Sequence, residues 1–584
     1  MPEVIDKNSA VKRLMEAVRV ADARLKPFRD NRRTFLKEYV GPYYTRTGDG
    51  AGASATGPEP INMLFSLASV IVPHLVSQNP KAMVTSKNPQ LGPTARMFGE
   101  AWNALAKEID LWRALRSCIF DALFGMGIMK VGLSPGGELM EMEEGYLHDN
   151  GQVYADAVDL DDYVIDAAAK SREAASFEGN RYRVPLEWAL ESELYDPDIL
   201  RKLPIHYSDN TSRERGAAEL SRGAANLQEA AEYSEHVELL DLWRPLEGDI
   251  VTIPGSPDIV VPDFIAQFEY NGPERGPFVD LNFFPVPHNV MGVSTVAEVY
   301  DLHVMINKLA RKAGRQADRQ KELVLFDEVV TEEAERVRDA SDGEMVGVGS
   351  VSRYAQVSFG GASEDTYKQL GFLFEQFSRI AGNIDLIGGL QAESKTLGQD
   401  QMLYQGASGR LEDMRTLAHT FMKSVGERMA WYLWYDPLAD QPITVQGAGG
   451  VQIPAQWNED EKEGEFLELN FDIEPYSMQR DDPTSKFERV MTWITGVVLP
   501  TAQIGAMQGA ILDVPKLVEM TGKMLNLPEA SEIYMPGPPM GMGMDAVQPP
   551  GGSNTTNVSS GRGGGSRPEP SNTQSSKPAQ GPGQ

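Results

Sequence analysis

The sequence predicts an α+β fold that is predominantly helical. Apolar residues recur at three- and four-residue spacing over 8–40, 292–322, 363–385 and 400–434, which predicts long helices. Residues 129–164 and several later segments change to a two-residue alternation that is typical of strands. The 584 residues are 41% hydrophobic and 24% charged, a globular composition, and this length suggests about three or four domains.

The charge balance limits the partners that this chain can bind. Asp and Glu total 84 against 54 Lys and Arg, a formal net charge of −30, so the surface as a whole repels nucleic acid. Any DNA contact must use a local basic strip or be loose enough for DNA to slide. A protein that is merely soluble can have the same balance.

Cysteine content and hydropathy exclude further classes. The one cysteine, Cys118, excludes an internal disulfide framework and a CxxC metal site, which favours a reducing compartment. The most apolar stretch, 61–76, contains Pro73 and is shorter than the roughly 20 residues that a bilayer span requires. We therefore expect a buried helix there and no membrane association.

The first half of the chain is predicted to hold helices followed by short strands. An amphipathic helix with a basic outer face is expected over 8–40, a Gly- and Pro-rich loop over 41–60, and a helix from Ile61 to near Pro73. One long helix is expected from Pro93 through Leu123, ended by Gly125 and Gly127. The expected strands are MKVGLS, QVYADAV and DYVID, and then HVELLDLWRP, DIVTI, DIVVP and FIAQFEY.

In the second half, a small module separates two long helices. The first helix is expected over 292–322, and a cap at 363–365 begins the second, which continues through Ile384. Between them, LVLFDEVV predicts a strand, TEEAERVRDA a helix, and EMVGVGS with YAQVSF a β-like pair. The elements expected next are a loop over 386–399, a third helix near 400–434, strands in ITVQGAGGVQIPAQW and FLELNFDIEP, a helical pattern to 534, and a disordered Gly-, Pro- and Ser-rich tail over 535–584.

The common enzyme motifs are absent from the sequence. There is no GxxxxGK[ST], HExxH or GxSxG, and the seven histidines are scattered. One carboxylate group could hold Ca²⁺ or Mg²⁺ and would suit a metal-dependent nuclease, but it lacks EF-hand spacing, and a solvated loop is the favoured interpretation. This group comprises Asp156, Asp159, Asp161, Asp162 and Asp166. We predict no enzyme activity and no cofactor.

A strip of basic residues lies on one face of the 292–322 helix. Its members recur at three- or four-residue steps and are Lys308, Arg311, Lys312, Arg315 and Arg319. Such a strip can contact DNA phosphates without reading bases. A solvated face, or a salt-bridge seam between copies of the chain, is the alternative.

The loop over 386–399 is the second feature of interest. It is polar and longer than the 2–8 residues that usually join packed helices, and long ordered loops are often functional. An ordinary surface loop is the alternative.

The order of these elements resembles a known family. FDALFGMGIMKVGLSP (120–135) is similar to a helix-to-strand entry of tailed-bacteriophage portal proteins, the head-to-tail connectors. VDLDDYVIDAAAKSREAASFEGNRYRVPLEWA (158–189) is similar to a segment of the same family in which a strand ends in Asp and a Pro-Leu begins a helix. The helix–module–helix arrangement over 292–384, with the loop after it, resembles the stem, clip and tunnel loop of that family.

The resemblance implies a portal-like fold assembled as a ring, most simply a homododecamer. It divides the chain into an N-terminal helix and loop (1–60), a wing (61–291), a stem helix (292–322), a β-containing clip (323–362), a return stem helix (363–385), a tunnel loop (386–399), a long helix with a second wing part (400–499), a short helical crown (500–534) and a disordered tail (535–584). The implied channel residues of the tunnel loop are Gln391, Ser394, Lys395, Thr396 and Gln399.

The resemblance also implies a function and its partners. The ring would sit at the capsid portal vertex of the virion after assembly in the host cytoplasm, and double-stranded DNA would pass through it during packaging and ejection. The implied partners are other copies of the chain, the large terminase, a head–tail adaptor protein, the major capsid protein and the scaffolding protein. The alternatives are another ring or scaffold component of a virion, or a metal-dependent nuclease that uses the group from Asp156 to Asp166.

Overall fold

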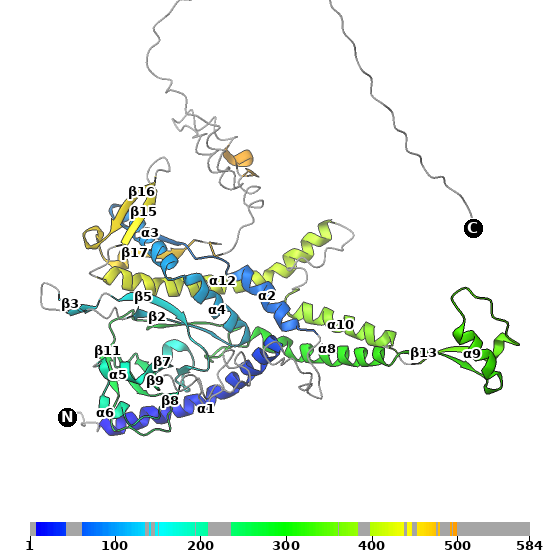
Figure 1. Ribbon diagram of the computed structural model, residues 1–584. Coiled ribbons are helices and arrows are strands. Elements are labelled where there is room, and N and C mark those ends of the chain that lie inside the picture. The colour runs from blue at the N-terminus through cyan, green and yellow to red at the C-terminus, as the bar shows by residue number, and fades with distance from the viewer. Residues whose placement is uncertain are drawn as a thin grey trace, which may run out of the picture. The chain divides into compact units, whose positions relative to one another are not determined.

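The computed structural model mixes helices and strands, as the sequence predicts (Figure 1). Helices form about half of it. The share of strands is therefore larger than the prediction of a predominantly helical fold implied. Two compact units divide the chain at Arg489 and Val490. The structure describes residues 7–41, 61–134, 139–141, 147–149, 151–192, 194–207, 235–359, 361, 363–383, 397–436, 441–446, 452–474, 477–478, 491–492 and 494–498.

Helix α1 (Lys7–Val40) is amphipathic and packs against a sheet. Val11, Met15 and Val18 bury its first turns in a core shared with strand β9 (Glu235–Arg244). The expected basic outer face is wrong for part of the helix, because Arg29 and Arg32 are buried. These arginines face carboxylates and backbone carbonyls, which replace the water that they would otherwise bind.

The single helix expected from Pro93 through Leu123 is two helices, α3 (Gly92–Glu108) and α4 (Leu111–Phe124). Asp110 has a left-handed backbone with φ of 51°, and an aspartate tolerates that conformation better than most residues. The Trp112 N–H then bonds to the Asn79 side chain at 2.8 Å instead of to a helical carbonyl. The earlier helix, α2 (Met63–Leu75), holds Pro73 in its last turn.

Two antiparallel sheets form the centre of the first unit. The larger one has the order β11-β10-β9-β7-β6, with β8 paired to β9, and the smaller one has the order β12-β2-β5. The expected strand DIVVP lies in an irregular segment at 258–262 and joins neither sheet. The bounds are β2 (Gly127–Ser134), β5 (Gln152–Ala157), β6 (Tyr163–Ile165), β7 (Glu178–Pro185), β8 (His206–Tyr207), β10 (Asp249–Pro254), β11 (Ala266–Glu269) and β12 (Phe278–Leu281).

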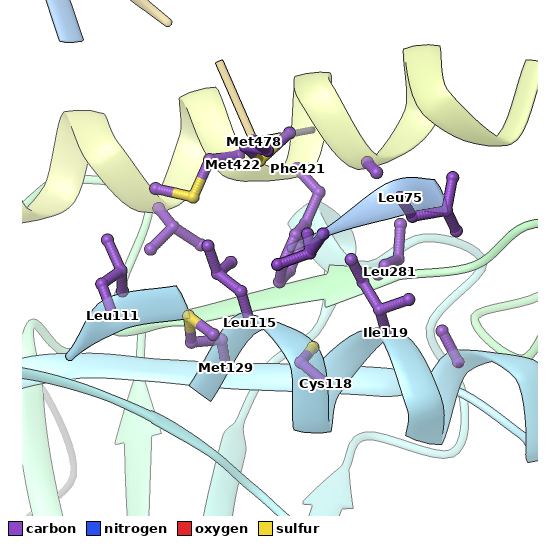
Figure 2. Packing of buried hydrophobic residues seen from close by; sticks show 14 of the residues in the cluster. Leu75, Leu111, Leu115, Cys118, Ile119, Met129, Leu281, Phe421, Met422 and Met478 are labelled. Atoms are coloured by element: carbon purple, nitrogen blue, oxygen red, sulfur yellow. The ribbon is translucent and has the colours of Figure 1, made fainter. Parts of the chain in front are cut away.

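The main core lies between the smaller sheet, α4 and the long helix α12 (Leu397–Tyr435) (Figure 2). Ile119 from α4, Met129 from β2 and Phe421 from α12 are all buried in this cluster. Cys118 is fully buried in the same cluster, and burial raises the pKa of its thiol well above the usual range. A neutral, apolar thiol of this kind acts as a small hydrophobic residue in the packing.

Replacement of Gly127 by alanine should destabilise this core by about 1–3 kcal/mol. A Cβ at this position would lie 2.4 Å from the Cys118 carbonyl oxygen and 2.8 Å from its sulfur, so α4 or β2 would have to shift. Gly314→Ala is a matched control, because nothing lies within 4 Å of its added methyl, and alanine favours a helix. Guanidinium unfolding of both variants measures the difference, and equal midpoints would contradict this account.

Helices α8 (Thr295–Asp318) and α10 (Glu364–Ile380) lie side by side, and the chain between them forms a small module (Figure 1). Ser294 and Ser363 cap them, each accepting a hydrogen bond from the backbone three residues later. The second helix ends four residues before the expected Ile384, where Gly382 and Asn383 take positive φ.

The module is built on one two-stranded ladder. Strand β13 (Lys321–Phe326) pairs with β14 (Tyr354–Phe359) over six residues, and α9 (Thr331–Asp339) lies between them in sequence. The β-like pair expected for EMVGVGS with YAQVSF is therefore wrong. YAQVSF takes KELVLF as its partner, and residues 344–350 remain outside the ladder.

The remaining elements complete the first unit. They are α5 (Leu186–Glu191), α6 (Pro197–Leu200), the hairpin β3 (Leu139–Glu141) with β4 (Leu147–Asp149), the hairpin β15 (Gln441–Gln446) with β16 (Gln452–Trp457), and the pair β1 (Ala82–Ser86) with β17 (Leu469–Ile473). In the second unit one π-helical turn is described, Ile494–Val498. The expected crown (500–534) and tail (535–584) lie outside the described residues. No helix in the described part is both long and apolar enough to cross a bilayer.

Candidate nucleic-acid interface

The predicted basic strip lies on the outer face of α8. One face of this helix buries Val296, Val299 and Ile306. The strip lies on another face, where Lys308, Lys312, Arg315 and Arg319 are exposed and Arg311 is half-buried. The structure thus brings all five predicted residues together along one edge of the helix, as a period of 3.6 residues requires.

Within the described residues, the exposed members of the strip form no ion pair. Those members are Lys308, Lys312, Arg315 and Arg319, and the Arg315 Nε donates to the Arg311 carbonyl oxygen at 3.3 Å. The neighbouring helix α10 differs, because its Lys368 and Arg379 pair with glutamates one turn earlier at 2.8 and 3.0 Å. The four exposed cations therefore give α8 a positive surface on a chain with a net charge of −30.

Charge changes sign along the exposed face of α8. The first turns expose Glu298 and Asp301, and the cations begin about two turns after Asp301, at Lys308. An anionic surface that lies along this face would meet repulsion at one end and attraction at the other. The attraction is confined to the half of the helix nearest the module.

The module beyond α8 exposes apolar side chains and two strand edges. Leu323, Val324, Leu325 and Phe326 of β13 are 43–57% exposed. The ladder has only two strands among the described residues, so each has an outer edge whose backbone groups lack a strand partner there. Exposed edges of this kind are templates for pairing with another chain.

A family model described as the phage SU10 portal protein matches residues 138–462. This match covers more than half of the chain, including α8, the module and α10. The chain belongs to the phage SU10 portal protein family. Membership implies a structural role rather than an enzymatic one, at the portal vertex of a phage capsid. A comparison with curated proteins found no match.

Most of the predicted channel residues of this portal protein are not described. Gln391, Ser394, Lys395 and Thr396 lie outside the described residues. Gln399 belongs to the first turn of α12, which begins at Leu397, so the loop is shorter at its end than the expected range of 386–399. The proposed role of these five residues remains a prediction.

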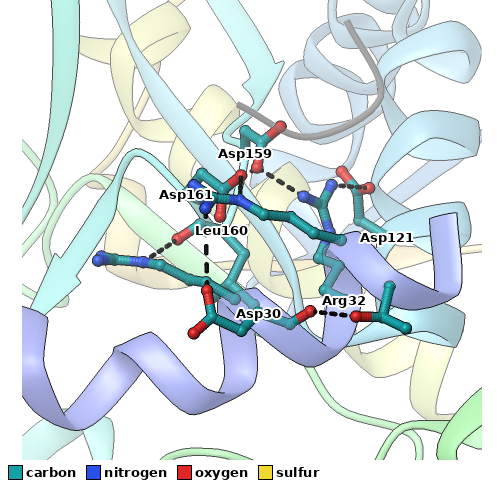
Figure 3. Close-up of polar contacts among 9 residues, drawn as sticks. Asp30, Arg32, Asp121, Asp159, Leu160 and Asp161 are labelled. Atoms are coloured by element: carbon teal, nitrogen blue, oxygen red, sulfur yellow. Dashed lines mark hydrogen bonds and ion pairs between the residues drawn. The ribbon is translucent and has the colours of Figure 1, made fainter. Parts of the chain in front are cut away.

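The carboxylate group considered for a metal is divided among separate partners in this structure (Figure 3). Arg32 donates to Asp159 at 2.8 Å, and Arg33 donates to Asp161 at 3.2 Å. Asp166 accepts from two backbone N–H groups, those of Ala168 and Ser176. No group of three or more metal-ligating side chains is found in the part of the chain that the structure describes. The arginines neutralise two of the five carboxylates, Asp159 and Asp161.

Asp121, which sequence reasoning missed, completes this ion network. Arg32 donates to it at 2.7 Å, and the arginine side chain is 3% exposed. Burial raises the pKa of Asp121 to about 6, although Arg32 and its hydrogen bond oppose that rise. A signal for the buried arginines exists in the sequence, because Leu25, Arg29, Arg32 and Leu36 recur at steps of four, three and four residues.

Proposed function

We propose that this portal protein forms a ring through which double-stranded DNA passes during packaging and ejection. The observation that supports this most directly is the exposed basic strip of α8, an exception on a strongly acidic chain. Acidic walls give DNA no deep binding minimum, so a duplex can slide. A sparse ring of cations would slow or retain the duplex without trapping it.

In this proposal α8 and α10 form the stem, residues 323–362 the clip, and residues 386–399 the tunnel loop. The clip carries the exposed strand edges and the apolar residues of β13, which suit pairing between neighbouring copies. About twelve copies would close the ring with cyclic symmetry. The sparse cations of α8 and the tunnel loop would face the channel.

The same arrangement would provide a docking platform. The large terminase would bind at the clip during packaging, and a head–tail adaptor protein would replace it afterwards. The ring would assemble in the host cytoplasm with the scaffolding and major capsid proteins. Another ring or scaffold component of the virion is the second candidate, and it differs by having no clip contact with the terminase. A pull-down of the purified chain with terminase separates the two candidates.

Negative-stain electron microscopy and native mass spectrometry of the full-length protein test the ring. We expect a homogeneous annulus with a central hole, and a stable monomer at micromolar concentration would contradict the proposal. The double variant Leu323→Asp/Leu325→Asp should shift the ring to smaller species, because it places charge on the β13 contact. Val260→Asp is the control, since this valine is 74% exposed and lies outside the clip. A double variant that assembles as well as the control would show that β13 makes no contact between copies.

A further inference from the structure

A cavity of about 590 Å³ lies where α12 meets the turn before β12. Its walls include the apolar rings of Trp243 and Phe421 and the basic side chains of Arg172, Arg275 and Arg428. Three acidic residues, Glu173, Glu274 and Asp280, line the same cavity. The basic strip, the clip and the predicted tunnel loop contribute no residue to it.

Arg428 is buried in this wall, and among the described residues it forms no ion pair. Its side chain is 4% exposed and comes from the inner face of α12. It donates to the carbonyl oxygens of Gly276 at 2.8 Å, Ser424 at 2.8 Å and Arg275 at 3.2 Å. A guanidinium has five N–H groups, so two remain for another acceptor.

A second guanidinium lies next to the first. Arg172 donates from Nη2 to the Arg275 carbonyl oxygen at 3.2 Å, the same atom that Arg428 binds. Its Nε is engaged by Glu178 at 2.8 Å. Burial and the positive charge of Arg172 lower the pKa of Arg428 to about 10. Glu178 binds Arg172 through both carboxylate oxygens, at 2.8 and 3.0 Å, so Arg428 is the member of this arginine pair that lacks a carboxylate partner among the described residues.

Acidic residues also line the cavity, and they do not neutralise Arg428. Asp280 accepts a hydrogen bond from the Asn282 amide at 3.1 Å, burial raises its pKa, and it does not lie within ion-pair distance of Arg428. Glu173 and Glu274 line the cavity as well, but neither lies within ion-pair distance of Arg428. The positive end of the cavity is therefore the one where α12 meets the turn at 275–276.

We propose that this cavity binds a small oxyanion, a phosphate or a carboxylate, between the guanidinium groups of Arg428 and Arg172, with the exposed Arg275 at its entrance. Bidentate hydrogen bonds from guanidinium to phosphate or carboxylate are among the strongest polar contacts in proteins. The bound anion would join α12 to the turn before β12. It would thereby stabilise the contact between the long helix and the sheets.

The test is thermal unfolding of the full-length protein in sodium phosphate and in sodium chloride of equal ionic strength. We expect a saturable rise in the melting temperature with phosphate and none with chloride. Arg428→Gln should abolish this rise. Arg275→Gln should weaken phosphate binding about tenfold without changing the melting temperature in chloride, because a charged hydrogen bond is removed at an exposed position.

Arg415→Gln is the matched control on the same helix. Arg415 pairs with Glu412 at 3.0 Å and does not line the cavity, so this variant should respond to phosphate as the wild type does. Arg275→Gln keeps the test decisive if Arg428→Gln fails to fold. Equal responses of the wild type to phosphate and chloride, or an undiminished response of Arg275→Gln, would overturn the proposal and leave Arg428 as a structural link between α12 and the turn.

Two further arms identify the source of the anion. Acetate at equal ionic strength should raise the melting temperature through Arg275 and Arg428 if the cavity accepts a carboxylate. A short DNA duplex is too wide to enter, so it should not compete with inorganic phosphate. Competition by the duplex would contradict an enclosed small-anion cavity and would place Arg275 and Arg428 on a DNA-binding surface instead. A response to duplex alone, without a response to phosphate or acetate, would contradict a small-anion cavity.

Discussion

Arg32→Met should lower the free energy of unfolding by about 3–5 kcal/mol at neutral pH. The substitution removes a cation that binds both Asp121 and Asp159, at 2.7 and 2.8 Å. Methionine fills much of the same volume, so the loss comes from the uncompensated carboxylates rather than from a cavity. Asp121 suffers most, because its side chain is 15% exposed and that of Asp159 is 35% exposed, so less water reaches Asp121.

The deficit of this variant should depend on pH. Burial raises the pKa of Asp121 to about 6 in the wild type, and loss of Arg32 should raise it further. A raised pKa means that the folded state binds the proton more tightly than the unfolded state does. The cost of burying the ionised carboxylate is therefore present above the folded pKa and fades as the pH falls toward about 4. The variant should lie furthest below the wild type at pH 8 and approach it at pH 5.

Guanidinium unfolding at pH 8, 6.5 and 5 measures this effect. Arg32→Met/Asp121→Asn should recover part of the lost stability at pH 8 and show less pH dependence, because the asparagine carries no charge to bury. Arg19→Met is the control on the same helix, since Arg19 and its partner Glu16 are both about 60% exposed and their pair should matter little. A constant deficit at all three pH values would show that Asp121 titration is not its cause.

Periodicity alone predicts the long helices of this portal protein well. Helix α8 lies within the expected 292–322 because its apolar residues repeat on one face over many turns. The break at Asp110 is not visible in that pattern, since Ile109 and Trp112 continue the apolar period across it. The break depends on the left-handed backbone of Asp110 and on the distant acceptor Asn79, which sequence spacing does not report.

Strand pairing and buried charge are harder to predict, because both depend on contacts between residues that are distant in the sequence. EMVGVGS alternates like a strand, yet the ladder forms between β13 and β14, a choice made by tertiary contacts. Arginine is exposed in most proteins, so sequence reasoning predicts Arg32 on the outer face of the helix. It does so although apolar residues lie at helical spacing from Arg32. The basic strip is predictable because a helix face and a run of cations are both local properties of the sequence.

Lys312→Gln/Arg315→Gln/Arg319→Gln should weaken association of the ring with double-stranded DNA while leaving the ring intact. These side chains are exposed and make no ion pair with any described residue, so neutral glutamine removes charge without disturbing the packing. Removal of each cation that binds a phosphate should reduce the slope of log affinity against log salt concentration by about 0.9. We expect the affinity to fall at least about tenfold in 50 mM salt and to differ much less in 200 mM salt. Fluorescence anisotropy with a short labelled duplex measures the affinity and its dependence on salt concentration.

The control variant Lys368→Gln/Arg379→Gln helps to decide whether the basic strip contacts DNA or joins neighbouring copies by salt bridges. It also removes positive charge from α10, but these cations already pair with Glu364 and Glu375, so they should bind phosphate more weakly. If the strip instead joins neighbouring copies by salt bridges, the triple variant should break the ring in native mass spectrometry. An intact ring with unchanged DNA affinity and salt slope would exclude the strip from both roles. Only an intact ring with a reduced slope fits a surface that holds a moving duplex by its phosphates.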